Sequence, residues 1–166
     1  MFRSGVGAIP RRTAARGTAW NRTSPRRPPM PEPLHTARIP VRWSDMDALG
    51  HVNNAVYHTF YEQARIEWFQ RLADGGDWPG APRTGPVLAA VEAQFKRPVV
   101  YPATVVVRLS AGSVGRTSLP LDCELTVEGD EDTVYATART VLVWIDLDSG
   151  RAVRLPEAIR ERLGTE

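Results

Sequence analysis

Cysteine and lysine are nearly absent from this 166-residue chain, in which Cys123 is the only cysteine and Lys96 the only lysine among 21 basic residues. A single cysteine excludes an intramolecular disulfide and a zinc site built from several cysteines. We therefore expect a reducing, cytoplasmic setting. The chain also lacks an apolar run of about 18 residues, which leaves no candidate membrane span.

Acidic residues are missing from the first 31 positions. Seven arginines precede Glu32, whereas the remaining 14 basic and 19 acidic residues give the rest of the chain a net charge of −5. The pI of 9.0 thus reflects the N-terminal segment, and we expect no nucleic-acid partner for the domain. Residues 1–33 also lack apolar periodicity, so we predict a disordered Arg/Pro-rich extension followed by one domain over 34–166. A translation start at Met30 stays open.

The domain begins with a strand pattern that leads into a long helix. Apolar residues alternate with polar or small ones over 34–43, which predicts a strand. Asn53 or Asn54 can cap a helix that runs to about Leu72. Apolar and aromatic residues recur along this helix every three or four positions, forming a stripe that must lie on a sheet: Tyr57, Tyr61, Ala64, Trp68 and Leu72.

The apolar period changes to two after the helix. We predict strands over 87–98, 104–113, 119–127 and 133–145, joined by turns that make neighbours antiparallel. A short helix over 156–163 closes the chain. The predicted class is therefore α+β, with one long helix on an antiparallel sheet. Because one helix covers only one face of so apolar a sheet, we also expect an oligomer.

The segment just before the long helix carries the residues that can take part in catalysis or substrate binding, namely Asp45, Asp47, Gly50 and His51. Free N–H groups at a helix start, together with the positive end of the helix dipole, can hold the oxyanion that forms when a thioester carbonyl is attacked. Gly50 lets the backbone approach a substrate closely. A carboxylate just upstream can attack the carbonyl or take a proton from an attacking water. The segment therefore combines groups that can attack a carbonyl and groups that can stabilise the resulting oxyanion.

This segment resembles the signature of one enzyme family. The run Asp45-x-Asp47-x-x-Gly50-His51-Val52-Asn53-Asn54-x-x-Tyr57 is similar to that of the 4-hydroxybenzoyl-CoA-type hotdog thioesterases, and the likeness extends over about residues 34–160. It implies a hotdog fold, a homodimer or homotetramer, and active sites at the subunit interface. It also implies that Asp47 is the nucleophile or general base. His51 is a candidate second catalytic residue with a polarising or positioning role, and the alternative is a hydrogen-bonded histidine of the core. The implied oxyanion and substrate-binding residues are Gly50, Val52, Asn53, Asn54 and Tyr57.

The expected substrate is an acyl-CoA or an acyl group on acyl carrier protein, handled without metal or cofactor and without a membrane partner. Leu49 stands where the plant acyl-carrier-protein thioesterases have a catalytic asparagine, so their mechanism is not expected here. Lys96, Arg97 and Arg116 are candidates for contacting the phosphates of CoA.

Several alternatives stay open. Asp45 is expected to have a structural hydrogen-bonding role. Glu62 or Glu67 of the helix is an alternative catalytic carboxylate, although each is also spaced to form a solvent-side pair, with Arg65 and Arg71 respectively. The whole protein is alternatively a hotdog dehydratase or hydratase, or a non-catalytic protein that binds acyl thioesters.

Overall fold

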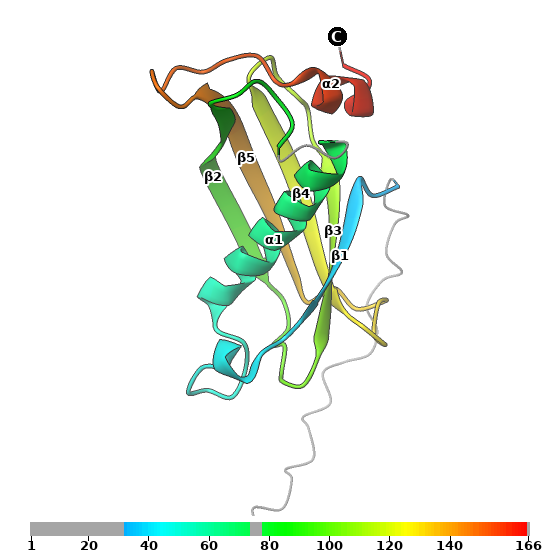
Figure 1. The fold of residues 1–166 in the computed structure, drawn as a ribbon. Coiled ribbons are helices and arrows are strands. Elements are labelled where there is room, and N and C mark those ends of the chain that lie inside the picture. The colour runs from blue at the N-terminus through cyan, green and yellow to red at the C-terminus, as the bar shows by residue number, and fades with distance from the viewer. Residues whose placement is uncertain (1–31, 74–77, 166) are drawn as a thin grey trace, which may run out of the picture.

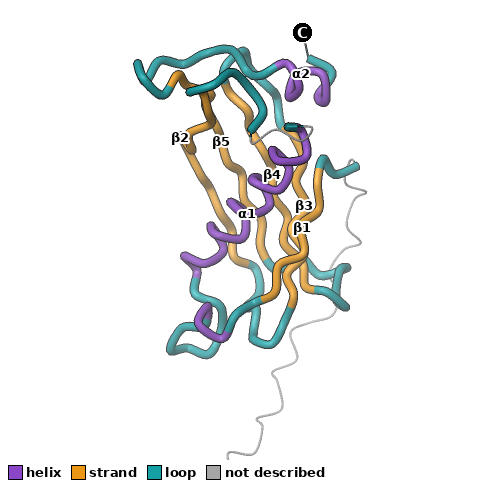
Figure 2. Tube along the Cα trace, viewed as in Figure 1, coloured by secondary structure: helices purple, strands orange, loops and turns teal. Residues whose placement is uncertain are grey.

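Five antiparallel strands form one sheet in the order β1-β3-β4-β5-β2 (Figures 1 and 2). The strands are β1 (His35–Pro40), β2 (Thr84–Phe95), β3 (Thr104–Ala111), β4 (Ser118–Val127) and β5 (Ala136–Asp146). The structure is a computed structural model that describes residues 32–73 and 78–165. The extension predicted over residues 1–33 therefore lies almost wholly outside the described residues. Each of the predicted strands is present.

One long helix, α1 (Asn54–Leu72), lies diagonally across one face of the sheet (Figure 1). Asn53 caps it by accepting a hydrogen bond from the N–H of Ala55 at 2.9 Å. A short helix, α2 (Glu157–Leu163), lies at the opposite end of the sheet from the start of α1. Within the described part of the chain, no helix is long and apolar enough to cross a membrane. The predicted α+β hotdog architecture is confirmed.

The core fills the space between α1 and the sheet. The predicted helix stripe points inward, since Tyr57, Tyr61, Ala64 and Trp68 are all buried. In β4 the alternation marks the core face: Leu119, Leu121, Cys123 and Leu125 are buried against the helix side, in the same cluster as the stripe. It does not mark the other face as exposed, because Glu124 and Thr126 are buried there as well. Cys123 is a core residue, and burial raises the pKa of its thiol to about 12.

Two local departures from the predicted elements have clear causes. The first strand ends at Pro40 rather than Trp43, because residues Trp43–Asp45 turn into a short 3-10 helix that leaves Trp43 78% exposed. β2 contains a bulge between Leu88 and Ala90. The bulge shifts the alternation, so Leu88, not Ala89 as predicted, shares the helix-facing side of the sheet with Val91 and Phe95.

The charges on α1 are spaced so that two solvent-side pairs could form, and solvated, unpaired charges are the favoured alternative. Within the described residues, neither Glu62 with Arg65 nor Glu67 with Arg71 forms a pair. Glu67 instead lies 3.1 Å from Nε2 of His35, which is buried on β1. Arg65 is only 7% exposed, and burial lowers the pKa of its guanidinium. Sequence spacing shows which side chains of a helix are neighbours, but it does not show which of them are buried against the sheet.

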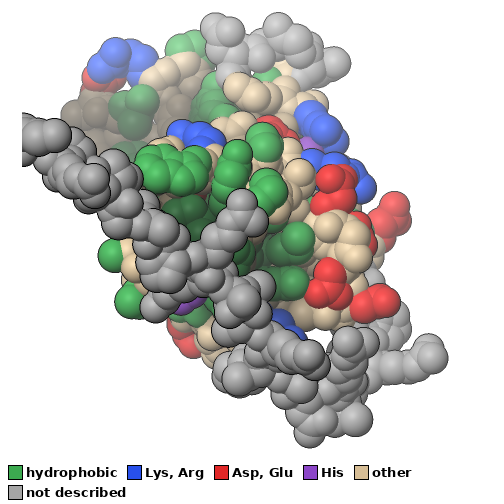
Figure 3. All heavy atoms as spheres, turned by 90° about the horizontal axis from the view of Figure 1, so that it is seen from below, with side chains coloured by type: hydrophobic (Ala, Val, Ile, Leu, Met, Phe, Trp, Pro, Cys, Tyr) green, Lys and Arg blue, Asp and Glu red, His purple; other side chains and the backbone are tan. Residues whose placement is uncertain are grey.

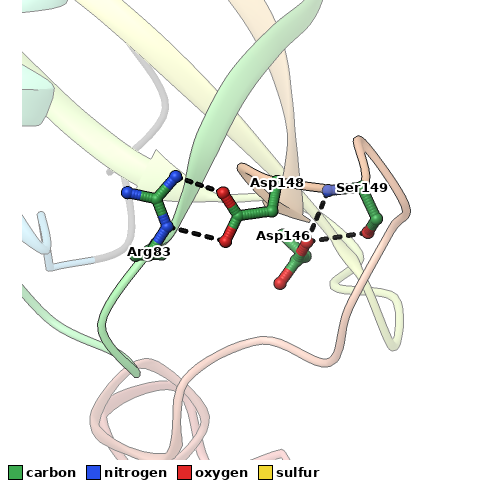
Figure 4. A network of polar contacts seen from close by, with 4 residues as sticks. All are labelled: Arg83, Asp146, Asp148 and Ser149. Carbon is green, nitrogen blue, oxygen red and sulfur yellow. Dashed lines mark hydrogen bonds and ion pairs between the residues drawn. The ribbon is translucent and has the colours of Figure 1, made fainter.

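The end of the sheet near α2 is held by a polar network (Figure 4). Arg83, just before β2, donates two hydrogen bonds to the carboxylate of Asp148, one of them from Nε at 2.6 Å. Asp146 at the end of β5 accepts 2.7 Å hydrogen bonds from both the N–H and the hydroxyl of Ser149. The contact of Arg83 with Asp148 fastens the loop after β5 to the start of β2, and the hydrogen bonds of Ser149 with Asp146 close the turn within that loop. Each of these exposed contacts contributes little free energy.

Two tyrosines provide a matched test of this core. The hydroxyl of Tyr61 is fully buried and has no hydrogen-bond partner among the described residues, whereas the hydroxyl of Tyr135 donates to Asp130 at 2.9 Å. Removing an unsatisfied buried hydroxyl relieves a desolvation cost, so we expect Tyr61→Phe to raise the free energy of unfolding by up to about 1 kcal/mol. Tyr135→Phe should lower it by roughly 0.5–1 kcal/mol. Urea denaturation of both variants checks this, and a loss of stability in Tyr61→Phe would contradict the assigned environment.

Candidate active site

The loop between β1 and α1 is anchored by Asp45. Its side chain is 2% exposed and accepts hydrogen bonds from the N–H of Arg42 at 2.7 Å and from Nε and Nη2 of that arginine at 3.0 and 2.7 Å. Its backbone oxygen accepts from the N–H of Asn53 at 2.9 Å. Burial acts to raise the pKa of Asp45, but the bonds and charge of Arg42 outweigh it and leave the pKa below its usual value. The predicted structural role of Asp45 agrees with these contacts.

Asp47 stands at the start of a tight reversal that ends at His51. The N–H of Asp47 donates to the oxygen of His51 at 2.8 Å, and the N–H of Gly50 donates back to the oxygen of Asp47 at 3.1 Å. Gly50 closes this turn with a φ of 85°, a conformation that favours glycine. The turn therefore sets both the direction of the Asp47 side chain and its distance from the start of α1.

The Asp47 carboxylate is held by one oxygen only. Oδ1 accepts a 2.8 Å hydrogen bond from the N–H of Leu49 and lies 3.6 Å from Nδ1 of His51. No donor to Oδ2 is found among the described residues. The carboxylate is 24% exposed, and the His51 side chain is 38% exposed. One oxygen thus fixes the orientation while the other is available to a water or a substrate.

The N–H groups at the start of α1 are not equivalent. The N–H of Val52 donates to the oxygen of Val99 at 2.8 Å, and that of Asn53 donates to Asp45, so both are occupied by the fold. The N–H of Ala55 is taken by the Asn53 cap. The N–H of Asn54 has no acceptor among the described residues. Of the predicted oxyanion donors at the helix start, Asn54 is therefore the one whose backbone N–H is free.

These residues meet at one pocket of about 390 Å³. It brings together the predicted Asp47, His51, Val52, Asn54 and Tyr57. Gly50 and Asn53 shape the loop but do not line the pocket. The pocket opens at the end of the molecule where α1 begins, and Figure 3 shows hydrophobic side chains gathered in the middle of this end with both basic and acidic side chains around them.

The opposite wall of the pocket comes from the end of β2, where the sequence offered Lys96 and Arg97 as phosphate contacts but did not single out Phe95. Phe95, 48% exposed, packs against the buried ring of Tyr57 with ring centroids 5.0 Å apart. Lys96 and Arg97 follow it and line the same pocket. Phe95 appeared in the sequence only as one more apolar strand position. Phe95 differs from the other apolar residues of β2 in being the last residue of the strand, directly before two basic residues.

The other candidates lie elsewhere. Neither Glu62 nor Glu67 lines the pocket, and Glu67 is engaged with His35. Arg116 lies at the opposite end of the same sheet, where its backbone oxygen accepts from the N–H of Leu155, just before α2. The structure therefore does not join Arg116 to Lys96 and Arg97 within one chain. Among the described residues, no group of three His, Cys, Asp or Glu side chains is placed to hold a metal ion.

Known proteins resemble this chain in both sequence and fold. The chain is 30% identical over 126 residues to FadM, a long-chain acyl-CoA thioesterase of Escherichia coli, covering 76% of this chain and 94% of FadM. It is 26% identical to ATL3, a chloroplastic acyl-acyl carrier protein thioesterase of Arabidopsis thaliana, over 78% of this chain and 67% of that protein.

Solved structures give the same result. The PA2801 protein of Pseudomonas aeruginosa is 43% identical with a TM-score of 0.74, covering 80% of this chain and 99% of its own. A thioesterase of Thermus thermophilus, solved with coenzyme A and zinc, is 37% identical with a TM-score of 0.64, covering 80% and 93%. The model of the thioesterase-like superfamily matches residues 41–163, which include the whole candidate site. This chain is a member of the thioesterase-like superfamily.

Proposed function

We propose that the protein hydrolyses acyl thioesters, with acyl-CoA as the substrate class, and that Asp47 supplies the carboxylate for the reaction. The observation that carries this proposal is the pairing, in one pocket, of a carboxylate held by a single oxygen with a free N–H at the start of α1. The acyl-CoA and acyl-carrier-protein thioesterases among its relatives support the substrate class.

The proposed reaction begins with the thioester carbonyl oxygen accepting a hydrogen bond from the N–H of Asn54, where the helix dipole also favours negative charge. Asp47 takes a proton from a water, whose oxygen attacks the carbonyl carbon. The carbon–sulfur bond then breaks, the acid is released, and the proton passes to the departing thiolate. A direct attack by Asp47, giving an anhydride that water hydrolyses, requires the same placement of the carboxylate.

His51 and Tyr57 have supporting roles in this proposal. Nδ1 of His51 is too far from Oδ1 of Asp47 for a hydrogen bond at 3.6 Å, but it is close enough to stabilise the carboxylate by charge when protonated. We assign His51 a positioning role. The buried ring of Tyr57 packs against Phe95 and forms an apolar wall for the acyl group, and burial raises the pKa of its hydroxyl.

We also propose that the active form is a homodimer or homotetramer built on β2. This strand is an edge of the sheet, and its apolar side chains are open: Val87, Leu88, Val91 and Phe95 are 39–48% exposed. A second copy laid along β2 would cover these groups and border the pocket, since Phe95 belongs to both.

The single buried cysteine supports our expectation of a reducing, cytoplasmic location.

The catalytic assignment is tested by Asp47→Asn. The amide oxygen of asparagine can still accept from Leu49, so the loop should keep its shape while the negative charge is lost. We expect kcat/KM for acyl-CoA hydrolysis to fall at least about a hundredfold. Release of free thiol from a panel of acyl-CoAs measures it, with circular dichroism as a folding check. Glu62→Gln is the matched control and should retain activity within about twofold. Full activity of Asp47→Asn, or its loss in Glu62→Gln, would overturn the assignment.

The proposed assembly is tested by placing a charge on the exposed edge strand β2. We expect the wild type to show two or four times the 18.4 kDa of one chain in sedimentation velocity. Val91→Lys should shift it toward the single chain, because a lysine at a buried apolar contact is strongly unfavourable. Leu147→Lys, at a comparably exposed leucine outside β2, serves as the control and should leave the mass unchanged. A wild type that sediments as one chain would refute the proposed assembly.

A further inference from the structure

The face of the sheet that is turned away from α1 carries a second cavity, of about 500 Å³. Phe95 contacts Tyr57 of α1, so the side chains of Gln94 and Glu92, which alternate with it along β2, point to this other face. Their neighbours in register on the next strands line the same cavity, which we call the trench: Glu92 and Gln94 on β2, Thr137 and Arg139 on β5, and Asp122 and Glu124 on β4.

The acidic charge of the trench is not balanced by its own bases. Its lining holds three carboxylates and one arginine, Arg139. Arg139 is in register with both Glu92 and Asp122, but within the described residues it forms an ion pair with neither. Its guanidinium reaches instead toward Gly112, just after β3, where Nη2 lies 3.4 Å from the position that a Cβ would take. Arg108 lies 3.9 Å from the third carboxylate, that of Glu124. Glu92 and Asp122 are therefore the carboxylates that a cationic partner would meet.

We propose that the trench is the docking site of the chain's own N-terminal extension, whose arginines pair with Glu92 and Asp122. Residues 1–31 lie outside the described residues and carry seven arginines and no acidic residue, whereas the rest of the chain has a net charge of −5. A guanidinium binds a carboxylate through two parallel N–H donors, which an ammonium group lacks, and every base of the extension is an arginine. Because the extension also lacks apolar periodicity, charge is the interaction that its sequence favours.

The extension joins the domain beside the trench. The register of the sheet leads from His35, the first residue of β1, through Leu109 and Cys123 to Ala138. Cys123 and Ala138 line the trench, so the chain enters the sheet at the level of this cavity. Neighbouring strands lie about 4.8 Å apart, which puts β5 about 14 Å from β1. Arg27 precedes His35 by eight residues, which can span about 26 Å when extended. The arginines nearest the domain can therefore reach every strand of the trench.

Tethering makes weak ion pairs sufficient for this contact. A single exposed ion pair contributes little, but a linked segment faces its site at an effective concentration in roughly the millimolar range. The docked extension would cover the face of the sheet that α1 leaves open. The trench shares no lining residue with the pocket that contains Asp47, so this contact is independent of the proposed reaction.

Cleavage by chymotrypsin measures the docking in the full 166-residue chain. Chymotrypsin takes aromatic side chains in its specificity pocket, and Trp20 stands two residues before Arg22. Mass spectrometry follows the loss of residues 1–20, and a free peptide of residues 1–31 gives the rate for an undocked extension. The wild type is compared with Glu92→Gln/Asp122→Asn, with Arg22→Gln/Arg26→Gln/Arg27→Gln, and with the combination of both sets. The matched control, Glu157→Gln/Glu161→Gln, removes two exposed carboxylates of α2 that lie outside the trench.

We expect the wild type to be cleaved after Trp20 at least about fivefold more slowly than the free peptide, and either set of substitutions to remove most of this protection. The combined variant should be cleaved no faster than each set alone, because both sets break the same contacts. Added salt should bring the wild type toward the rate of the peptide and leave the two variants nearly unchanged. The α2 control should behave like the wild type, and circular dichroism checks the folding of each protein.

A wild type that is cleaved as fast as the free peptide at low salt would refute the docking, whether or not the variants fold. Protection that survives in Glu92→Gln/Asp122→Asn, or that is lost equally in the α2 control, would refute the trench as its site. Protection that strengthens with protein concentration would assign the contact to the extension of a second copy and overturn the intramolecular docking. None of these measurements involves thioester hydrolysis, so a failure of the docking is distinguishable from a failure of the proposed function.

Discussion

The hydrogen bonds of Asp45 are the constraint on which the candidate site depends, because they fix both ends of the loop that carries Asp47. Its carboxylate holds Arg42 where the chain leaves β1, and its backbone oxygen holds the N–H of Asn53 where α1 begins. Arg42 keeps the pKa of Asp45 below its usual value despite burial. A carboxyl whose pKa is lowered on folding stabilises the fold above its ordinary pKa, and this contribution is lost as the pH falls through the lowered value. The geometry of the loop therefore depends on Asp45 remaining ionised.

This anchoring separates the groups that build the site from the groups left for a substrate. The N–H groups of Val52 and Asn53 form hydrogen bonds within the fold, whereas the N–H of Asn54 has no acceptor in the described part of the chain. Asp47 likewise commits Oδ1 to the N–H of Leu49 and leaves Oδ2 without a donor among the described residues. Preorganised groups of this kind are effective in catalysis because they need not be reoriented during the reaction. The fold thus presents one hydrogen-bond acceptor, Oδ2 of Asp47, and one donor, the N–H of Asn54, to the same pocket.

Local patterns in the sequence predicted much of this structure. Alternation located the strands, the aromatic stripe located α1, and the spacing from Asp45 to Tyr57 placed the loop at the helix start. Long-range features were not accessible in the same way. The pairing of β2 with β5 brings Phe95, Lys96 and Arg97 to the pocket, and the bulge after Leu88 changes which side chains face α1. Neither has a signature in neighbouring residues, because both depend on which strands meet and in which register.

Which amide of the helix start is free could not be read from the sequence either, since it depends on contacts that Asp45 and Val99 make across the loop. That distinction is the centre of the account, and the most direct measurement is a crystal structure of the protein with an acyl-CoA analogue in which a methylene replaces the thioester sulfur. We predict that the analogue's carbonyl oxygen accepts a hydrogen bond from the N–H of Asn54 and that its carbonyl carbon faces Oδ2 of Asp47. A carbonyl bound away from both groups, or facing Glu62 or Glu67 instead, would contradict it.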